Sequence, residues 1–373
     1  MNEDKATRYH RLKRRASVVS VVSSVALLSA LFATGASAAL RAAAERLGAG
    51  ASPALHPFLV VLIYVVFLTV LNEAVGVPLA FYSGYFLEHR YDLSKQTIGG
   101  WLADQAKSFG IGILLGAGAA ELVYALIRAY PAQWWIPAAA AFTVVIVVLT
   151  NLAPVVLLPL FYPVKPLDRD ALRARLLALA DRAGARVLGA YEWGLGAKTK
   201  KANAALAGLG STRRILVSDT MLAEYSDEEI EVVLAHELAH HVHGDIWKGI
   251  VFESALVLAG FYAAAAALAA AVGRAGVRGV DDPAGLPLLL LAAGAVSLVA
   301  VPAGHAISRA FERRADRFAL DLTGNPAAFI SAMRRLGAQN LAEEHPSRVV
   351  QWLFYSHPPM RDRIASAQSR IRN

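Results

Sequence analysis

Long apolar runs alternate with polar stretches along this chain, and the length of the runs is the first guide to its fold. A helix needs about 20 residues to cross the roughly 30 Å hydrocarbon core of a bilayer. The pattern predicts a mostly α-helical, polytopic membrane protein, in agreement with a composition that is 56% hydrophobic and 18% charged. Six runs are long enough to span: residues 17–39, 57–82, 108–130, 134–161, 249–272 and 285–308.

The largest polar stretch, residues 163–248, predicts a small α+β domain. Its first part, residues 168–185, has the apolar spacing of a helix. Two apolar segments follow, "KANAALAG" at 201–208 and "RRILVS" at 213–218, and the turn "LGST" between them predicts a β-hairpin. The expected division is a transmembrane region of about four spans with a polar loop at 83–107 (1–162), the polar domain (163–248), two further spans (249–308) and a polar C-terminal segment (309–373).

The net charge of +8 comes from basic residues that gather beside the predicted spans. This distribution is typical of positive charge retained on the cytoplasmic side of a membrane, so we expect no nucleic-acid partner. With the N-terminus inside, six crossings place the loop 83–107, the domain 163–248 and the C-terminal segment in the cytoplasm. The segment before the first span carries Lys5, Arg8, Arg11, Lys13, Arg14 and Arg15.

The first span has a second interpretation. A basic start, an apolar stretch and the small residues "GASAA" at 35–39 also resemble a secretory signal with its cleavage site. The later spans keep their orientation under both interpretations.

Four of the ten histidines lie in "VLAHELAHHVHGD" at 233–245, and the surrounding residues predict that this segment is a helix. Ser226 is followed three residues later by Glu229, which is the pattern of a capping box at a helix start. Gly244 is placed to end the helix, and an apolar span follows almost at once.

His236 and His240 form an H-E-x-x-H motif with Glu237 on this predicted helix. Residues four apart share one helical face, so both imidazoles can reach the same cation. The chain has no cysteine, so a transition-metal site must use His, Asp and Glu. The motif predicts a zinc site with Glu237 beside a metal-bound water; the alternative is a solvated helix with scattered histidines.

A catalytic zinc needs a third protein ligand and an open position. Gluzincins supply a glutamate from a second helix in an E-x-x-x-D pattern, and "SRAFERRAD" offers Glu312 followed by Asp316. Asp316 would accept a hydrogen bond from a ligand imidazole. The alternatives are a surface helix of ion pairs, or a third ligand from His243 or His305.

Four motifs, in this order along the chain, resemble the type I CAAX prenyl endopeptidases and their bacterial relatives, which are integral-membrane gluzincins. The resemblance covers about residue 55 to the C-terminus and includes the loop "FYSGYFLEHRYDLSKQT" at 81–97. The motifs are "NAALAGLGSTRRILVSDTML" at 203–222, "HELAH" at 236–240, "SRAFERRAD" at 308–316 and "SHPPMRDRI" at 356–364.

This resemblance implies zinc ligands and catalytic residues at matching positions. His236, His240 and Glu312 would bind one Zn²⁺, and Glu237 would be the catalytic base. It further implies that Asn203 lies on a strand edging the site, and that His357 and Arg363 hold substrate or stabilise the transition state. Eukaryotic members have seven spans around a water-filled chamber, so we expect about six to seven here.

Two carboxylates inside predicted spans, Glu73 and Glu121, also favour a polar chamber, because a carboxylate facing lipid is costly. The alternative places them near helix ends, neutral or reaching the interface.

We therefore expect a zinc metalloendopeptidase in which Glu237 activates water, acting on peptide or protein substrates at the bilayer. The Ala, Arg and Leu content suggests a bacterial inner-membrane protein with its site facing the cytoplasm, and a role in membrane-protein or peptide quality control. An intramembrane site-2-type protease is disfavoured, because polar residues flank the motif. A catalytically silent zinc scaffold or a transporter is the alternative from another class.

Overall fold

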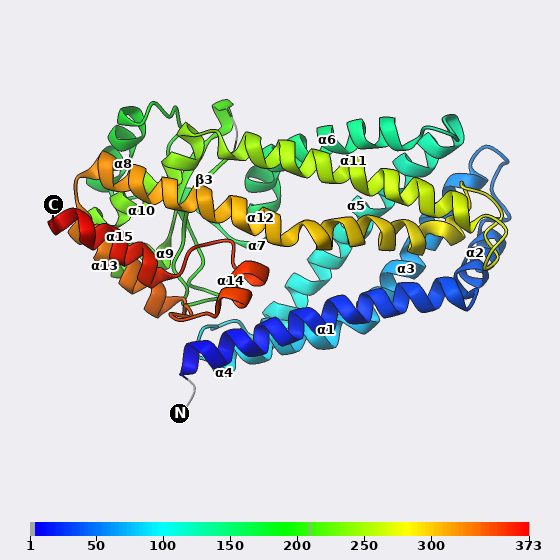
Figure 1. The fold of residues 1–373 in the computed structure, drawn as a ribbon, viewed down its shortest axis with the longest axis horizontal. Helices are drawn as coiled ribbons and strands as arrows, with labels where there is room; N and C mark the ends of the chain where they lie inside the picture. Colours follow the sequence, from blue (N-terminus) through cyan, green and yellow to red (C-terminus); the bar gives the residue numbers. More distant parts are fainter. Residues whose placement is uncertain (1–3, 209, 373) are drawn as a thin grey trace.

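Six helices long and apolar enough to span a membrane run along the length of the molecule, as the apolar runs predict (Figure 1). The computed structural model describes residues 4–208 and 210–372, and the six helices are counted among these residues. The spans are α1 (Lys5–Ala33), α3 (His56–Ala80) continued by η1 (Phe81–Phe86) and α4 (Leu87–Arg90), α5 (Ile98–Ala129), α6 (Trp135–Leu152) continued by η2 (Ala153–Leu157) and α7 (Leu158–Phe161), α11 (Asp245–Ala271) and α12 (Leu286–Thr323).

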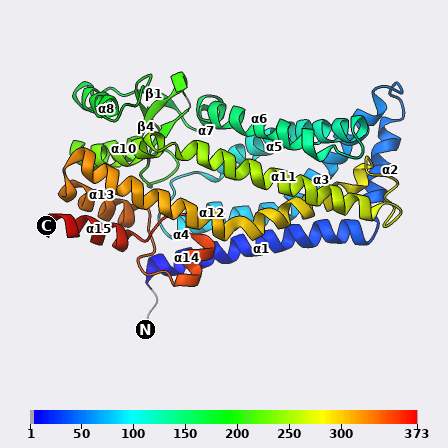
Figure 2. The same cartoon turned by 45° about the horizontal axis from the view of Figure 1, so that its top comes forward.

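The last span and the helix that carries Glu312 are one continuous element. At 38 residues, α12 is about 57 Å long, which is well beyond the thickness of a hydrocarbon core. Its apolar part packs against α11 and its charged end enters the α+β domain (Figures 1 and 2).

A polar network closes the end of the bundle far from the α+β domain. Here α2 (Ala36–Gly48) and η4 (Pro283–Gly285) pack together, and Arg41 pairs with the buried Asp282. Ser37 lies 2.6 Å from the Tyr64 hydroxyl and donates to the carbonyl of Ala284. This network fixes α2, which at 13 residues is too short to span.

Polar side chains line two cavities inside the bundle. Glu73 lies on one of about 830 Å³, between α1 and α3, together with cationic residues of α1. Asn72 and Glu253 lie on a second cavity of about 610 Å³, whose other walls are mainly apolar. Glu121 is half-buried on α5.

A four-stranded sheet forms the centre of the domain beside the bundle. Its strand order is β1-β2-β4-β3, with β2 parallel to β4 and the other pairs antiparallel. The predicted hairpin is confirmed as β3 and β4; η3 lies in the connecting turn, of which Leu209 is outside the described residues. The strands are β1 (Val164–Pro166), β2 (Ala190–Trp193), β3 (Ala204–Ala207) and β4 (Arg214–Ser218), and η3 covers Gly210–Thr212.

Helices from the middle and from the C-terminal part of the sequence cover this sheet and share one apolar core. Buried residues of the core include Leu176, Ile215, Leu234 and Phe329, which come from four different elements. The C-terminal segment therefore belongs to the same folded unit as the stretch 163–248. The helices are α8 (Asp170–Arg182), α9 (Asp219–Glu224), α10 (Asp227–Val242), α13 (Pro326–Gln339) and α15 (Met360–Arg372).

Ion pairs attach the N-terminal end of α1 to this unit. Glu88 is buried and accepts from the Tyr9 hydroxyl, and it pairs with Lys13 and with Lys201, which precedes β3. The loop 91–97 is bridged to the same region through Ser94 and Thr199. The predicted polar loop 83–107 is thus shortened to residues 91–97 between helices, and it joins the bundle to the α+β domain.

Candidate active site

The helix α10 forms as its sequence predicts and presents two histidines on one face. At its start the Ser226 hydroxyl accepts from the Glu229 amide at 3.2 Å, and the Glu229 carboxylate accepts from the Ser226 amide at 2.9 Å. Gly244 has φ +66°, which a glycine adopts without strain, and it separates α10 from α11. His236 is buried and His240 is partly buried.

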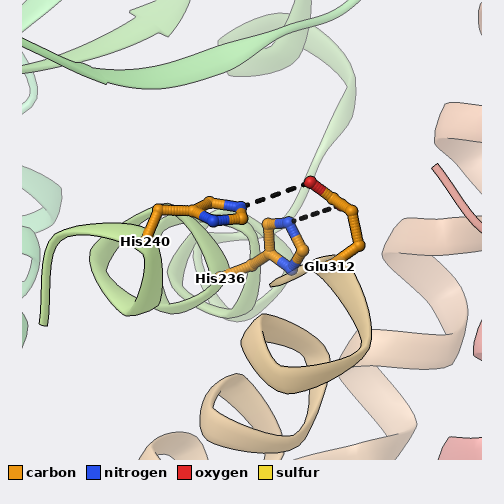
Figure 3. Close-up of side chains that lie close together, drawn as sticks. All are labelled: His236, His240 and Glu312. Carbon is orange, nitrogen blue, oxygen red and sulfur yellow. Dashed lines mark ion pairs between the residues drawn. The ribbon is translucent and has the colours of Figure 1, made fainter. Parts of the chain in front are cut away.

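His236, His240 and Glu312 converge, with one ligand atom of each within 4.8 Å of the others (Figure 3). The His236 Nε2 atom lies 3.2 Å from Glu312 Oε2, and the His240 Nε2 atom lies 3.4 Å from Glu312 Oε1. Glu312 Oε2 is buried and makes no aligned hydrogen bond among the described residues. Two imidazole nitrogens and a carboxylate facing one point form a donor set that suits a divalent cation with an open fourth position.

Asp316 and Arg363 support His236 from behind. The His236 Nδ1 atom lies 2.9 Å from Asp316 Oδ1, and Arg363 donates to both Asp316 oxygens at 2.9 and 2.6 Å. Asp316 and Arg363 are both buried. Burial opposes protonation of His236, but the nearby carboxylates of Asp316 and Glu312 raise its pKa to about 9. With Nδ1 facing Asp316, Nε2 is the ring nitrogen that faces Glu312 and is available to a cation there.

A second pair of residues, which the sequence analysis did not single out, supports His240 in the same way. The His240 Nδ1 atom lies 3.1 Å from Asp245 Oδ2, and Asp245 pairs with Arg314. Asp245 is 7% exposed and is the first residue of α11. The sequence places Asp245 just after the histidine cluster, so Asp245 could have been considered as a partner of His240. Arg314 could not, because it is 69 residues away from Asp245 along the chain.

Two further ionisable residues adjoin this cluster: Glu237, next to His236 in α10, and His357, beside Glu312. Desolvation raises the pKa of Glu237, and the charges of His236 and His240 partly offset that effect. His357 Nε2 lies 3.3 Å from Glu312 Oε1, while 58% of its side chain is exposed. An imidazole this exposed beside Glu312 is accessible to a bound substrate.

Asn203 lies immediately before β3, the edge strand of the sheet, and β3 packs against α10. Its side chain is exposed, while its backbone exchanges hydrogen bonds with Ser218. Arg363 contacts Asp316 and His236 from the buried side. His243 bonds the Ala239 carbonyl, so its Nδ1 is directed into its own helix.

Such a site, formed by a helix that directly precedes one membrane span and by the end of another span, defines an integral-membrane metallopeptidase. The chain belongs to peptidase family M48: residues 166–371 match that family's model, and residues 2–163 match the model described as "CAAX prenyl protease N-terminal, five membrane helices". The resemblance found in the sequence motifs is thereby confirmed. The second description counts five membrane helices, whereas four helices among the described residues of this part are long and apolar enough to span.

Individual relatives support the same assignment. The chain is 30% identical over 309 residues to the uncharacterized metalloprotease YhfN of Bacillus subtilis, covering 82% of this chain and 72% of the relative. It is 23% identical over 361 residues to CAAX prenyl protease 1 homolog of Homo sapiens, covering 83% and 73% of the two chains. The crystal structure of S. mikatae Ste24p shares the fold, with a TM-score of 0.85 at 22% identity over 97% of this chain and 87% of that one.

Proposed function

We propose that this protein is a zinc-dependent membrane endopeptidase in which His236, His240 and Glu312 hold the metal. The observation that carries the proposal is the convergence of two Nε2 atoms and a buried carboxylate. Zinc suits two histidines and a glutamate, and when bound it supplies Lewis acidity toward water and the scissile carbonyl.

Glu237 is the general base in this proposal. Its raised pKa brings the carboxylate closer to working pH, where it can take a proton from water and return it to the leaving amine. Asp316 and Arg363 keep His236 oriented, and the exposed ring of His357 contacts substrate near Glu312. Because Arg363 is buried behind His236, it affects the transition state indirectly, by holding Asp316 and thereby the His236 ring in place.

The free edge of β3, next to Asn203, offers backbone groups to an extended peptide. Substrate bound as an added strand would gain main-chain hydrogen bonds beside α10. In this proposal Asn203 contributes through contact with substrate and not as a metal ligand.

The positive charge beside the spans supports a cytoplasmic location for the α+β domain. Relatives carry the name CAAX prenyl protease, but the composition of this chain favours a bacterial inner membrane. We propose turnover of membrane proteins or peptides there, in place of cleavage of prenylated proteins.

The test is hydrolysis of an unstructured fluorogenic peptide by purified wild type and by Glu237→Gln. Glu228→Gln is the matched control, because Glu228 lies on the same helix but pairs with Arg175 at the surface. At equal zinc content, we expect wild type and Glu228→Gln to cleave and Glu237→Gln to lose at least about a hundredfold in rate. Equal cleavage by all three proteins would refute the role of Glu237, and zinc-loaded protein that cleaves no peptide would favour the silent scaffold.

A further inference from the structure

The short helix α14 (Arg348–Phe354) lies where the membrane bundle meets the α+β domain. It packs against α12 and lies beside α1 in both views (Figures 1 and 2). Neither the metal site nor the sheet uses its outward side chains.

Two arginines, one from α12 and one from α1, bind the C-terminal end of α14 and so position this helix relative to the two spans. Arg309 donates to the carbonyls of Gln351 at 3.0 Å and Tyr355 at 2.6 Å. Arg14 donates to the Tyr355 hydroxyl at 3.0 Å. Arg309 directly follows the apolar part of α12, and Arg14 precedes the apolar part of α1. The C-terminal end of α14 is therefore level with the polar boundary of both spans.

The outward face of α14 is apolar. Val349 is 64% exposed and Trp352 is 54% exposed, and residues three apart in a helix lie on the same face. Phe354 and Tyr355 instead line the cavity between α1 and α3. Trp247, at the start of α11 and so at the same end of the bundle, is 56% exposed.

We propose that the outward face of α14, Val349 and Trp352, inserts into the headgroup region of the leaflet next to the α+β domain. Tryptophan is enriched at this depth, because its ring is apolar and its N–H can be hydrated. The exposed Arg348, at the first position of α14, has the charge that matches lipid phosphate. The bilayer already surrounds the neighbouring spans α1 and α12, so the apolar face of α14 continues a surface that contacts lipid.

This insertion has a consequence for the metal site. His357 follows Trp352 by five residues and reaches Glu312. The segment that carries His357 is thus held at the leaflet surface, which favours substrates that approach along the membrane over those that arrive from solution.

The absence of cysteine makes the test direct, because one introduced cysteine gives one label. Trp352→Cys and Val349→Cys are labelled with an environment-sensitive fluorophore in liposomes of phosphatidylcholine and phosphatidylglycerol. Ile371→Cys, in the C-terminal helix, is the exposed control, and Val299→Cys, 82% exposed on the apolar part of α12, is the lipid control. Only variants that keep wild-type metal content and elution volume are compared.

We expect lipid-borne nitroxides to quench the labels at 349 and 352 at least threefold more than the label at 371, and aqueous iodide to show the reverse order. Labels at both positions that respond to iodide as strongly as the label at 371 would overturn the proposal. Labels shielded from both quenchers would also overturn it, because the face would then pack against protein, for example a second copy of this chain. Neither readout depends on peptide cleavage, so the result is independent of the proposed activity.

Discussion

Replacement of Asp245 by asparagine tests whether the metal centre depends on a residue that belongs to a membrane span. Asp245 is the first residue of α11, and its carboxylate connects His240 Nδ1 with the Arg314 guanidinium. Asparagine keeps the volume and one acceptor oxygen, but its NH₂ group replaces the other oxygen and cannot accept a hydrogen bond. His240 or Arg314 must therefore lose its partner.

The size of the effect follows from the burial of this link. Removing a hydrogen-bond partner of a metal-ligating histidine weakens metal binding by roughly 10–100-fold, which corresponds to about 1.4–2.7 kcal/mol. Asp245 is 7% exposed, so water cannot easily replace the lost contact. The effect of Asp316→Asn should fall in the same range, because Asp316 faces the Nδ1 atom of His236 as Asp245 faces the Nδ1 atom of His240.

Competition with a zinc chelator at fixed pH measures the affinity, and the absorption spectrum of the Co²⁺-loaded protein reports the ligand geometry. Asp170→Asn is the control, because the Asp170 side chain is 85% exposed and belongs to the same domain. Arg314→Lys should retain part of the affinity by keeping a positive charge near Asp245. A Kd of Asp245→Asn within twofold of wild type, with an unchanged Co²⁺ spectrum, would refute the reasoning.

Two further substitutions test the framework around the site by melting temperature. Glu229→Ala removes the capping box together with bonds to Ser331 and Arg335, and should destabilise the protein by about 1–3 kcal/mol. Glu229→Gln should have a melting temperature nearer that of wild type, because glutamine also serves a capping box. An equal loss in both variants would contradict this account. Asp282→Asn leaves Arg41 without its buried partner and should cost about 3–5 kcal/mol, whereas an unchanged melting temperature would show that this pair does not stabilise the outer end.

The sequence predicted the parts of this protein that depend on local periodicity. The six spans follow from the length of apolar runs, and α10 follows from Ser226, Glu229 and Gly244. Glu312 and Asp316 were found because they form an E-x-x-x-D pattern within one helix. In each case the signal and the structure involve the same short stretch of chain.

The parts that were missed depend on contacts between distant segments. The strands β1 and β2 have only three and four residues, and each exists through pairing with another part of the chain. Asp245 and Arg314 meet only because α10, α11 and α12 converge. The exposed apolar face of α14 can be interpreted only from its position at the ends of two spans. The seven residues of α14 do not by themselves predict that position.

The buried charges around His236 and His240 are not explained by a contribution to the stability of the fold. Glu312, Asp316 and Asp245 are nearly inaccessible to water, and Glu237 adds a fourth carboxylate. Arg363 and Arg314 balance two of these charges, and Lys248, 3.6 Å from Asp245, is half exposed.

Burying charges usually costs more than their attraction returns, so apolar residues would make a more stable helix junction. The remaining negative charge includes that of Glu312, beside the two Nε2 atoms. The Asp316 and Glu312 carboxylates raise the pKa of His236, and Glu312 raises the pKa of His240, so both imidazoles hold protons more tightly. A divalent cation at that point would balance this charge and displace those protons. The arrangement is therefore costly as a structural element and favourable as a metal site, which is the pattern expected where selection acts on function.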